Sequence, residues 1–291
     1  MMRTKISLFD ICNNLFLLLI ALVCTYPFLY IFFLSISDGR SIAAGDVVFF
    51  PKNPNLEAYQ YIMTNPSLGI FKGLLNSGIY TAVGTVVALL LTYMTAYVLS
   101  RKQIKGRFLI MSLFVFTWVF EAGIIPAYVV LNKLGFVDNW LVMIIPNAIN
   151  VQFLIITKTF LDGLPPELEE AAKIDGANDF QIMSRVYLAV SKPILATIGV
   201  FYAVFIWNQY LMPVIYLQNP DLQTIQVMLK RLVISSGDSN TAFRTIIQDG
   251  IMLNPGNLKA AAIFVAMVPI VLIYPFVQKY FQKGILIGSV K

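Results

Sequence analysis

The stretch Glu170-Ala171-Ala172-Lys173-Ile174-Asp175-Gly176 lies in a polar loop between two long apolar runs of the chain. Acidic residues crowd the same loop, namely Glu167, Glu169, Glu170, Asp175 and Asp179. Loops on the cytoplasmic side of a membrane usually carry an excess of Lys and Arg. An acidic, helix-forming loop at such a place therefore favours contact with a protein partner.

The composition around this loop is that of an integral membrane protein. Of 291 residues, 58% are hydrophobic and only 12% are charged, and the mean hydropathy is +0.76. Soluble domains have roughly 25% charged residues, so much of this chain must face lipid. The net charge of +6 is explained by basic residues that flank membrane spans, and it gives no reason to expect nucleic acid.

The residue types needed for catalysis or metal binding are scarce. There is no His, and the two cysteines, Cys12 and Cys24, lie near and within the first apolar run. Neither cysteine fits a disulfide framework or a metal site. The chain also lacks the Gly-x-x-x-x-Gly-Lys-Ser/Thr loop that cradles nucleotide phosphates. We therefore expect no enzyme, metal or cofactor in this chain, and any ATPase must be a separate polypeptide.

Six apolar segments are long enough to cross a bilayer as helices, which takes ~20 residues. Together they predict an all-α, single transmembrane domain over 1–291. The segments are about 14–36, 74–99, 108–131, 140–160, 193–217 and 259–281.

The distribution of Lys and Arg predicts the orientation of these spans. Basic residues gather in the N-terminal segment, in the 101–107 loop and in the C-terminal tail. By the positive-inside rule, both termini and the acidic loop at 161–192 are then cytoplasmic. The long segments 37–73 and 218–258 are extracytoplasmic; the former is expected to be loop plus short helix, and the latter to contain a helix at 222–234.

Local signals predict two helices in the acidic loop. Pro166 suits the first turn of a helix whose early acids favour the positive end of the helix dipole. Gly176 permits a left-handed turn, and Asn178 can cap a second helix from Asp179 to about Val190. The alternative, a pair of helices resting on the lipid surface, calls for Lys and Arg on the polar face.

The spacing of this loop resembles the "EAA" signature of permease subunits in binding-protein-dependent ABC importers. Glu170-Ala171-Ala172, Gly176 and Leu188 match it, Val186 conservatively replaces the family's Ile, and Ala189 replaces the family's Pro. The resemblance implies a type I importer permease fold in which this loop, the coupling loop, contacts the ATPase. It implies that the coupling residues are Glu170, Ala171, Ala172, Asp175, Gly176 and Phe180.

Further stretches are similar to the carbohydrate-uptake branch, and in particular to permeases for complex or acidic oligosaccharides such as alginate or pectin fragments. They include Gly123–Tyr128, Ser191–Thr197, Trp207-Asn208, Tyr274–Phe281 and the ending Lys283–Lys291. The resemblance implies a bacterial cytoplasmic membrane, a heterodimer with a second permease, two ATP-binding subunits that hold Mg-ATP, and an external solute-binding protein. It also suggests that the tail 282–291 reaches the ATPases and that the 218–258 loop faces the solute-binding protein.

Several polar residues within the predicted spans are candidates for the substrate pathway. Amides and aromatic rings commonly bind sugars, and an acid within a span usually faces the bundle interior. The same residues could instead bond neighbouring helices or lie at the interface. The candidates are Glu121, Asn147, Asn150, Gln152, Trp207, Asn208 and Tyr210. A secondary transporter or channel is the alternative function, with one mid-span acid as its support.

Overall fold

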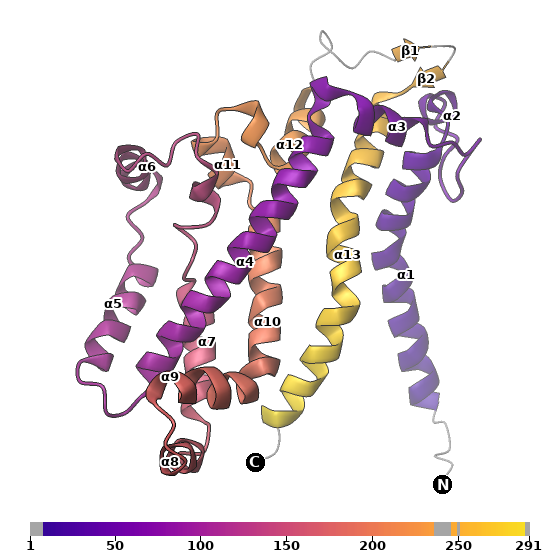
Figure 1. Cartoon of the computed structure of the whole chain (residues 1–291). Helices are drawn as coiled ribbons and strands as arrows, with labels where there is room; N and C mark the ends of the chain where they lie inside the picture. The colour runs from indigo at the N-terminus through magenta and orange to yellow at the C-terminus, as the bar shows by residue number, and fades with distance from the viewer. Residues whose placement is uncertain (1–7, 236–245, 249–250, 289–291) are drawn as a thin grey trace. The chain divides into compact units, whose positions relative to one another are not determined.

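The structure is a computed structural model that describes residues 8–235, 246–248 and 251–288 (Figure 1). The chain divides into two compact units. Unit 1 combines Met1–Phe71 with Met228–Val268, and unit 2 combines Lys72–Val227 with Pro269–Lys291.

Four helices of the described residues are long and apolar enough to span a membrane. They are α1 (Leu8–Ile36), α4 (Ile70–Ser100), the continuous helix Asp179–Trp207 and the Pro255–Ile273 part of α13 (Pro255–Gly288). A fifth is counted if the bent pair α5 (Arg107–Val119) and α6 (Ile124–Lys133) forms one span. The membrane class is confirmed, but the predicted count of six continuous helices is not.

The predicted helix at 108–131 is divided into α5 and α6, which meet at an angle of 116°. The residues between them are not helical, and Gly123 has a φ of +82°. Only glycine adopts this left-handed region without strain. The backbone therefore turns where the hydropathy pattern alone predicts a straight span.

The prediction of one helix at 140–160 is wrong. A short 3-10 helix, η2 (Trp140–Met143), is followed by non-helical residues and then by α7 (Val151–Asp162). Asn150 causes the restart, because its side-chain Oδ1 accepts hydrogen bonds from the N–H groups of Gln152 and Phe153. Such a cap satisfies N–H groups that a helix start leaves free.

The predicted span at 193–217 is also interrupted. Helix α10 (Leu188–Trp207) ends, and α11 (Leu211–Tyr216) begins after a short break. At its other end α10 continues without interruption from α9 (Asp179–Gln181) and the π-helical segment η3 (Ile182–Tyr187). The second loop helix, predicted to end near Val190, is therefore the start of this long helix.

In unit 1 the 37–73 segment forms short elements, of which α3 (Glu57–Thr64) packs on α1. These elements are α2 (Gly39–Ala43), α3 and η1 (Pro66–Leu68), as predicted for loop plus short helix. Ser35 Oγ on α1 lies 2.6 Å from the hydroxyl of Tyr59 on α3. The ring of Phe264 packs on both Phe32 and Tyr59, with centroid distances of 5.0 and 6.5 Å.

The 218–258 segment contains η4 (Pro220–Leu222) and α12 (Ile225–Ser235), so the predicted helix at 222–234 is present with a later start. An antiparallel pair follows, β1 (Ile246–Gln248) with β2 (Ile251–Leu253), in which Ile247 faces Met252. These are the only strands in the described part of the chain. Residues 236–245, 249–250 and the last three of the predicted tail, 289–291, lie outside it; 282–288 belong to α13.

Unit 2 holds three groups of buried residues along α4 and α10. The first, which we call the loop-end core, includes Tyr93, Ala96, Tyr97, Leu99, Leu154, Leu161, Ala172, Ile182 and Tyr187. A middle group joins Ala88, Ile198 and Tyr202. The far-end core includes Tyr80, Val142, Met143, Ile206, Tyr216 and Leu217. Figure 1 shows α8 (Glu167–Ile174) and α9 at one end of this unit and α6 and α11 at the other.

Candidate functional site

Helix α8 and its turn form as the local sequence predicts. Pro166 precedes a first turn that contains Glu167, Glu169 and Glu170. Gly176 has a φ of +78°, which is the left-handed conformation expected there. Asn178 and Gln181 form a capping box, in which each side chain accepts from the other residue's backbone N–H at 2.9–3.0 Å. The predicted first helix, the glycine turn and the capped start of the second helix are therefore all present.

Helix α8 and the start of α9 bury one small residue against the rest of unit 2 and expose larger ones. Ala172 is buried in the loop-end core. By contrast, Ile174 and Phe180 are 86% and 68% exposed. The other predicted coupling residues, Glu170, Ala171, Asp175 and Gly176, are exposed as well. The loop thus presents an apolar and acidic surface that unit 2 itself does not cover.

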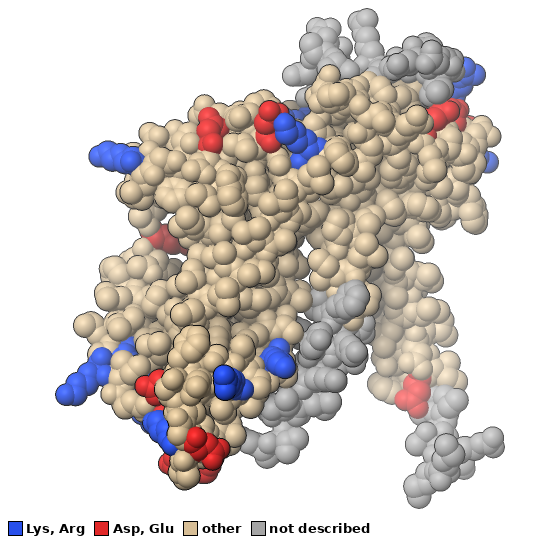
Figure 2. Space-filling view, in the orientation of Figure 1, with Lys and Arg blue, Asp and Glu red and all other residues tan. Residues whose placement is uncertain are grey.

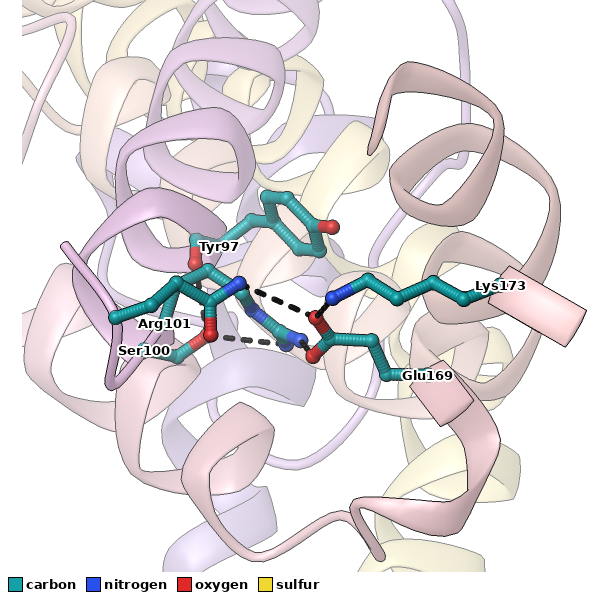
Figure 3. Close-up of polar contacts among 6 residues, drawn as sticks. Tyr97, Ser100, Arg101, Glu169 and Lys173 are labelled. Carbon is teal, nitrogen blue, oxygen red and sulfur yellow. Dashed lines mark hydrogen bonds and ion pairs between the residues drawn. The ribbon is translucent and has the colours of Figure 1, made fainter. Parts of the chain in front are cut away.

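Glu169 fastens α8 to the end of α4 (Figure 3). Its Oε2 accepts from Arg101 Nη1 at 2.5 Å, and its Oε1 accepts from Lys173 Nζ at 2.6 Å and Gln103 Nε2 at 3.2 Å. The side chains of Arg101 and Glu169 are only 8% and 16% exposed. A buried pair of this kind is costly to break on one side, because the remaining charge loses its partner.

The charges of this anchor are stable in the folded state. Lys173, together with Gln103 and Arg101, lowers the pKa of Glu169 below its ordinary value, although burial opposes this. Burial disfavours the charged form of Arg101, but Tyr187, Tyr97 and Glu169 outweigh it and raise the pKa of Arg101. Glu169 raises the pKa of Lys173.

Two tyrosine rings enclose the Arg101 guanidinium. Its Cζ lies 4.4 Å from the ring centroid of Tyr97 on α4 and 4.0 Å from that of Tyr187 in η3. Cations attract ring faces at such distances. The sequence reasoning used Arg101 only to orient the spans and missed this role. The spacing of Tyr97 and Arg101 by one helical turn was visible, but their partners Glu169 and Tyr187 lie far along the chain.

A cleft of about 520 Å³ opens beside this anchor between the end of α4, the start of α5, α7 and α8. Charged side chains line much of it: Arg101, Lys102, Arg107, Lys158, Asp162, Glu169, Glu170 and Lys173. Lys158 pairs with Asp162 inside α7. Figure 2 shows that charged residues gather at the α8 end of unit 2, while uncharged residues cover most of the surface between its ends.

The predicted pathway residue Asn150 has a structural role in addition to its cap. Its backbone N–H donates to the hydroxyl of Tyr202 at 2.9 Å, and the same hydroxyl lies 2.6 Å from Thr92 Oγ1. Tyr202 is fully buried. It therefore ties the start of α7 to α4 and α10, a connection that no local pattern in the sequence indicates.

The break between η2 and α7 and the break between α10 and α11 lie against the same part of α4. A Cβ added at Gly84 would come within 2.8 Å of Ile206 Cδ1 and 3.7 Å of Ile144 Cγ1, so the missing side chain allows this approach. Two buried amide atoms here, Asn147 Nδ2 and Gln209 Oε1, have no hydrogen-bond partner in the described part of the chain.

The remaining pathway candidates differ in their surroundings. Trp207 is buried at the end of α10, Tyr210 is half-buried, and Asn208 and Gln152 are exposed. Asn208 Nδ2 donates to the Val204 carbonyl at 2.9 Å. Glu121 is exposed in the bend between α5 and α6. The structure thus brings Ile144 and Ile206, beside these two breaks, to Gly84 on α4, and leaves Glu121 in a separate break.

The long apolar helices are those expected of a membrane permease, and the family comparison agrees with that class. The chain belongs to the family described as binding-protein-dependent transport system inner membrane component, whose model matches residues 66–287. The chain is thus a permease component of such a transport system, and the alternative of a secondary transporter or channel is not favoured.

Individual relatives agree with this placement over nearly the whole chain. The polygalacturonan/rhamnogalacturonan transport system permease protein YtcP of Bacillus subtilis is 40% identical over 287 residues, which are 99% of each chain. Protein LplC of the same organism is 40% identical over 97% of this chain and 95% of its own. A solved chain from a bacterial ABC transporter involved in the import of alginate, an acidic polysaccharide, has a TM-score of 0.86 at 30% identity, with 97% and 99% covered.

Proposed function

We propose that this permease imports an acidic oligosaccharide of the pectin or alginate type, as one half of a heterodimer with a second permease. Two separate subunits bind Mg-ATP, and an external solute-binding protein delivers the sugar. The chain is similar over nearly its whole length to a polygalacturonan/rhamnogalacturonan permease and to a chain of an alginate importer, and this similarity supports the substrate class. The basic 101–107 loop supports a cytoplasmic location for the coupling loop and both termini in a bacterial cytoplasmic membrane.

The exposed surface of the coupling loop carries the mechanistic part of this proposal. Ile174 and Phe180 are large apolar side chains left uncovered beside acids and a rigid glycine turn. Exposed apolar groups rimmed by polar ones mark protein interaction sites. In this proposal the ATPase contacts the exposed residues Glu170, Ala171, Asp175, Gly176 and Phe180, while the buried Ala172, also predicted as a coupling residue, holds α8 on the rest of unit 2. Closure of the ATPase on ATP then displaces α8.

We place the sugar pathway of this subunit at the two helix breaks beside Gly84. Interrupted helices in transporters commonly form binding sites, because their free polar groups can serve a substrate. The unpartnered amide atoms of Asn147 and Gln209 support this location. Trp207, Asn208 and Tyr210 line the same break, while Gln152 and the cap residue Asn150 belong to the start of α7; Glu121 contributes at a separate bend.

The test is reconstitution of the complete complex in lipid vesicles. Co-expression should yield this chain with a second permease and an ATPase. Binding protein loaded with an oligogalacturonide should then stimulate ATP hydrolysis and sugar uptake, whereas the same preparation offered a neutral maltooligosaccharide should not. Purification of the permeases without an ATPase would contradict the proposed coupling. Equal stimulation by the neutral sugar would contradict the proposed substrate class.

A further inference from the structure

Three side chains, two on α4 and one directly after its last residue, Ser100, hold the π-helical segment η3. Tyr93, Tyr97 and Arg101 are spaced four residues apart, so they follow one another along the same side of the helix. The hydroxyl of Tyr93 donates to the Met183 carbonyl at 2.7 Å. The ring of Tyr97 meets that of Tyr187 edge-to-face with centroids 5.4 Å apart, and Arg101 stacks on Tyr187.

The last of these residues also binds the coupling helix. Arg101 donates to Glu169 on α8 while its guanidinium lies between the rings of Tyr97 and Tyr187. Three elements therefore meet at one side chain: α8, the end of α4, and the π segment that leads into α10. Arg101 is nearly buried, so water does not separate these contacts.

The geometry of η3 suits a segment that adjusts. In a π turn the backbone hydrogen bonds join residues five apart, rather than four apart as in an α-helix, and such turns are often found at functional sites. Here it lies between the short capped start of α9 and the long helix α10. A pull on Tyr187 consequently acts where the helix has an irregular hydrogen-bond pattern rather than on a regular turn.

We propose that Arg101 is a positioning residue that transmits displacement of α8 to α4 and α10 together. When the ATPase moves α8, Glu169 carries Arg101 with it, and the two enclosing rings carry the end of α4 and η3. This inference rests on the proposed coupling function, but it concerns the connection inside this chain rather than the contact with the ATPase.

Substitutions at Arg101 and Tyr97 test the connection in the reconstituted complex. Arg101→Lys keeps the charge but loses the planar fork and stacking, and Tyr97→Leu removes one ring while Tyr97→Phe keeps it. We expect Arg101→Lys and Tyr97→Leu to lower sugar-stimulated ATP hydrolysis at least about fivefold, the lower range of typical coupling energies, with assembly retained. Tyr97→Phe should behave like the unsubstituted protein.

Lys158→Gln is the matched control, because it breaks an ion pair in the same cleft that lies within α7 and joins no second element. Its stimulation should remain normal. The inference is overturned if sugar-stimulated ATP hydrolysis of both Arg101→Lys and Tyr97→Leu equals that of the unsubstituted complex. Absence of stimulation in the unsubstituted complex would instead refute the proposed function.

A second measurement decides the question if the variants do not assemble. In otherwise unsubstituted protein, spin labels at the exposed residues Glu167 on α8 and Val98 on α4 report ATP-dependent displacement of each element relative to a label on the ATPase. We expect both sites to move in the same step. Movement at Glu167 with none at Val98 would overturn the inference.

Discussion

The α8 end of unit 2 and the region of its helix breaks are built from similar apolar helices but are held in different ways. At the α8 end, a buried ion pair, two tyrosine rings and a π segment connect α4, α8 and α10. Near the helix breaks, side-chain caps and one tyrosine hydroxyl hold the chain. The first arrangement concentrates several contacts on one charged residue, whereas the second distributes single hydrogen bonds. The first should therefore be more sensitive to one substitution.

The largest effect is expected for Glu169→Ala. This change leaves the nearly buried Arg101 without its carboxylate, and breaking a buried pair in this way typically costs ~3–5 kcal/mol. Thermal unfolding in detergent and protease cleavage of the coupling loop should both show the loss. Glu167→Ala, at an exposed position on the same turn, is the control and should leave both unchanged. Equal behaviour of the two variants would contradict the anchor.

At the breaks, Tyr202→Phe should have the next largest effect. It removes the hydroxyl shared by Thr92 Oγ1 and the Asn150 N–H, and an unsatisfied buried polar group costs ~1–3 kcal/mol. The melting temperature should fall while α8 remains resistant to protease. Tyr210→Phe, at a half-buried position, is the comparison. A protein as stable as the unsubstituted one would show that the hydroxyl does not hold the break.

Gly176→Val tests the turn at the α8 end. Its φ of +78° is unfavourable for a β-branched residue, and such strain costs ~1–3 kcal/mol. A Cβ there would meet nothing within 4 Å, so the loss would come from the backbone and not from a clash. Transport should fall while membrane insertion survives. Gly135→Val, at a comparable φ of +77° near α6, should spare sugar-coupled ATP hydrolysis.

Asn150→Ala should cost less, because loss of a helix cap is worth ~0.5–2 kcal/mol. Asn150→Asp keeps a capping oxygen and should restore most of the stability. Chemical denaturation in mild detergent can compare the three proteins. If Asn150→Ala and Asn150→Asp unfold alike, the cap does not determine where α7 begins.

The smallest effect concerns pH. The folded pKa of Glu169 is below its ordinary value of 4.5, so its stabilising contribution is complete above that value and is lost as pH falls through the lowered one. Between pH 8 and pH 5.5 the protease resistance of the coupling loop should stay constant. A loss within that window would show that the Arg101–Glu169 pair does not dominate the anchor.

The sequence predicted the features that depend on neighbouring residues. The turn at Gly176, the cap at Asn178 and the acidic start of α8 follow from local backbone chemistry, and the structure contains all three. The contacts of Arg101 with Glu169 and Tyr187 join distant parts of the chain, and a single sequence does not specify such pairings. Local signals alone therefore described the loop but not its attachment.

The errors near the breaks have a different cause. Hydropathy averages over a window, and apolar residues continue through 140–160 whether or not the backbone is helical there. Asn150 is predicted only as a pathway residue, and its second role as the cap of α7, for which Asn is a favoured residue, is not among the sequence predictions. Pro146 and Gly123 are likewise residues that indicate irregular backbone within an apolar segment. Capping and glycine signals thus deserve weight even inside a strongly apolar segment.

The most direct test of the coupling account measures sugar-stimulated ATP hydrolysis of complexes that carry Ile174→Ala with Phe180→Ala. Leu134→Ala, at a 65% exposed position beyond α6, is the matched control for loss of an exposed apolar side chain. The account predicts that the double variant loses stimulation by at least about tenfold, within the usual range of coupling energies, while the control keeps it. Normal stimulation in the double variant would contradict the assignment of α8 and the start of α9 as the part of the coupling loop that contacts the ATPase.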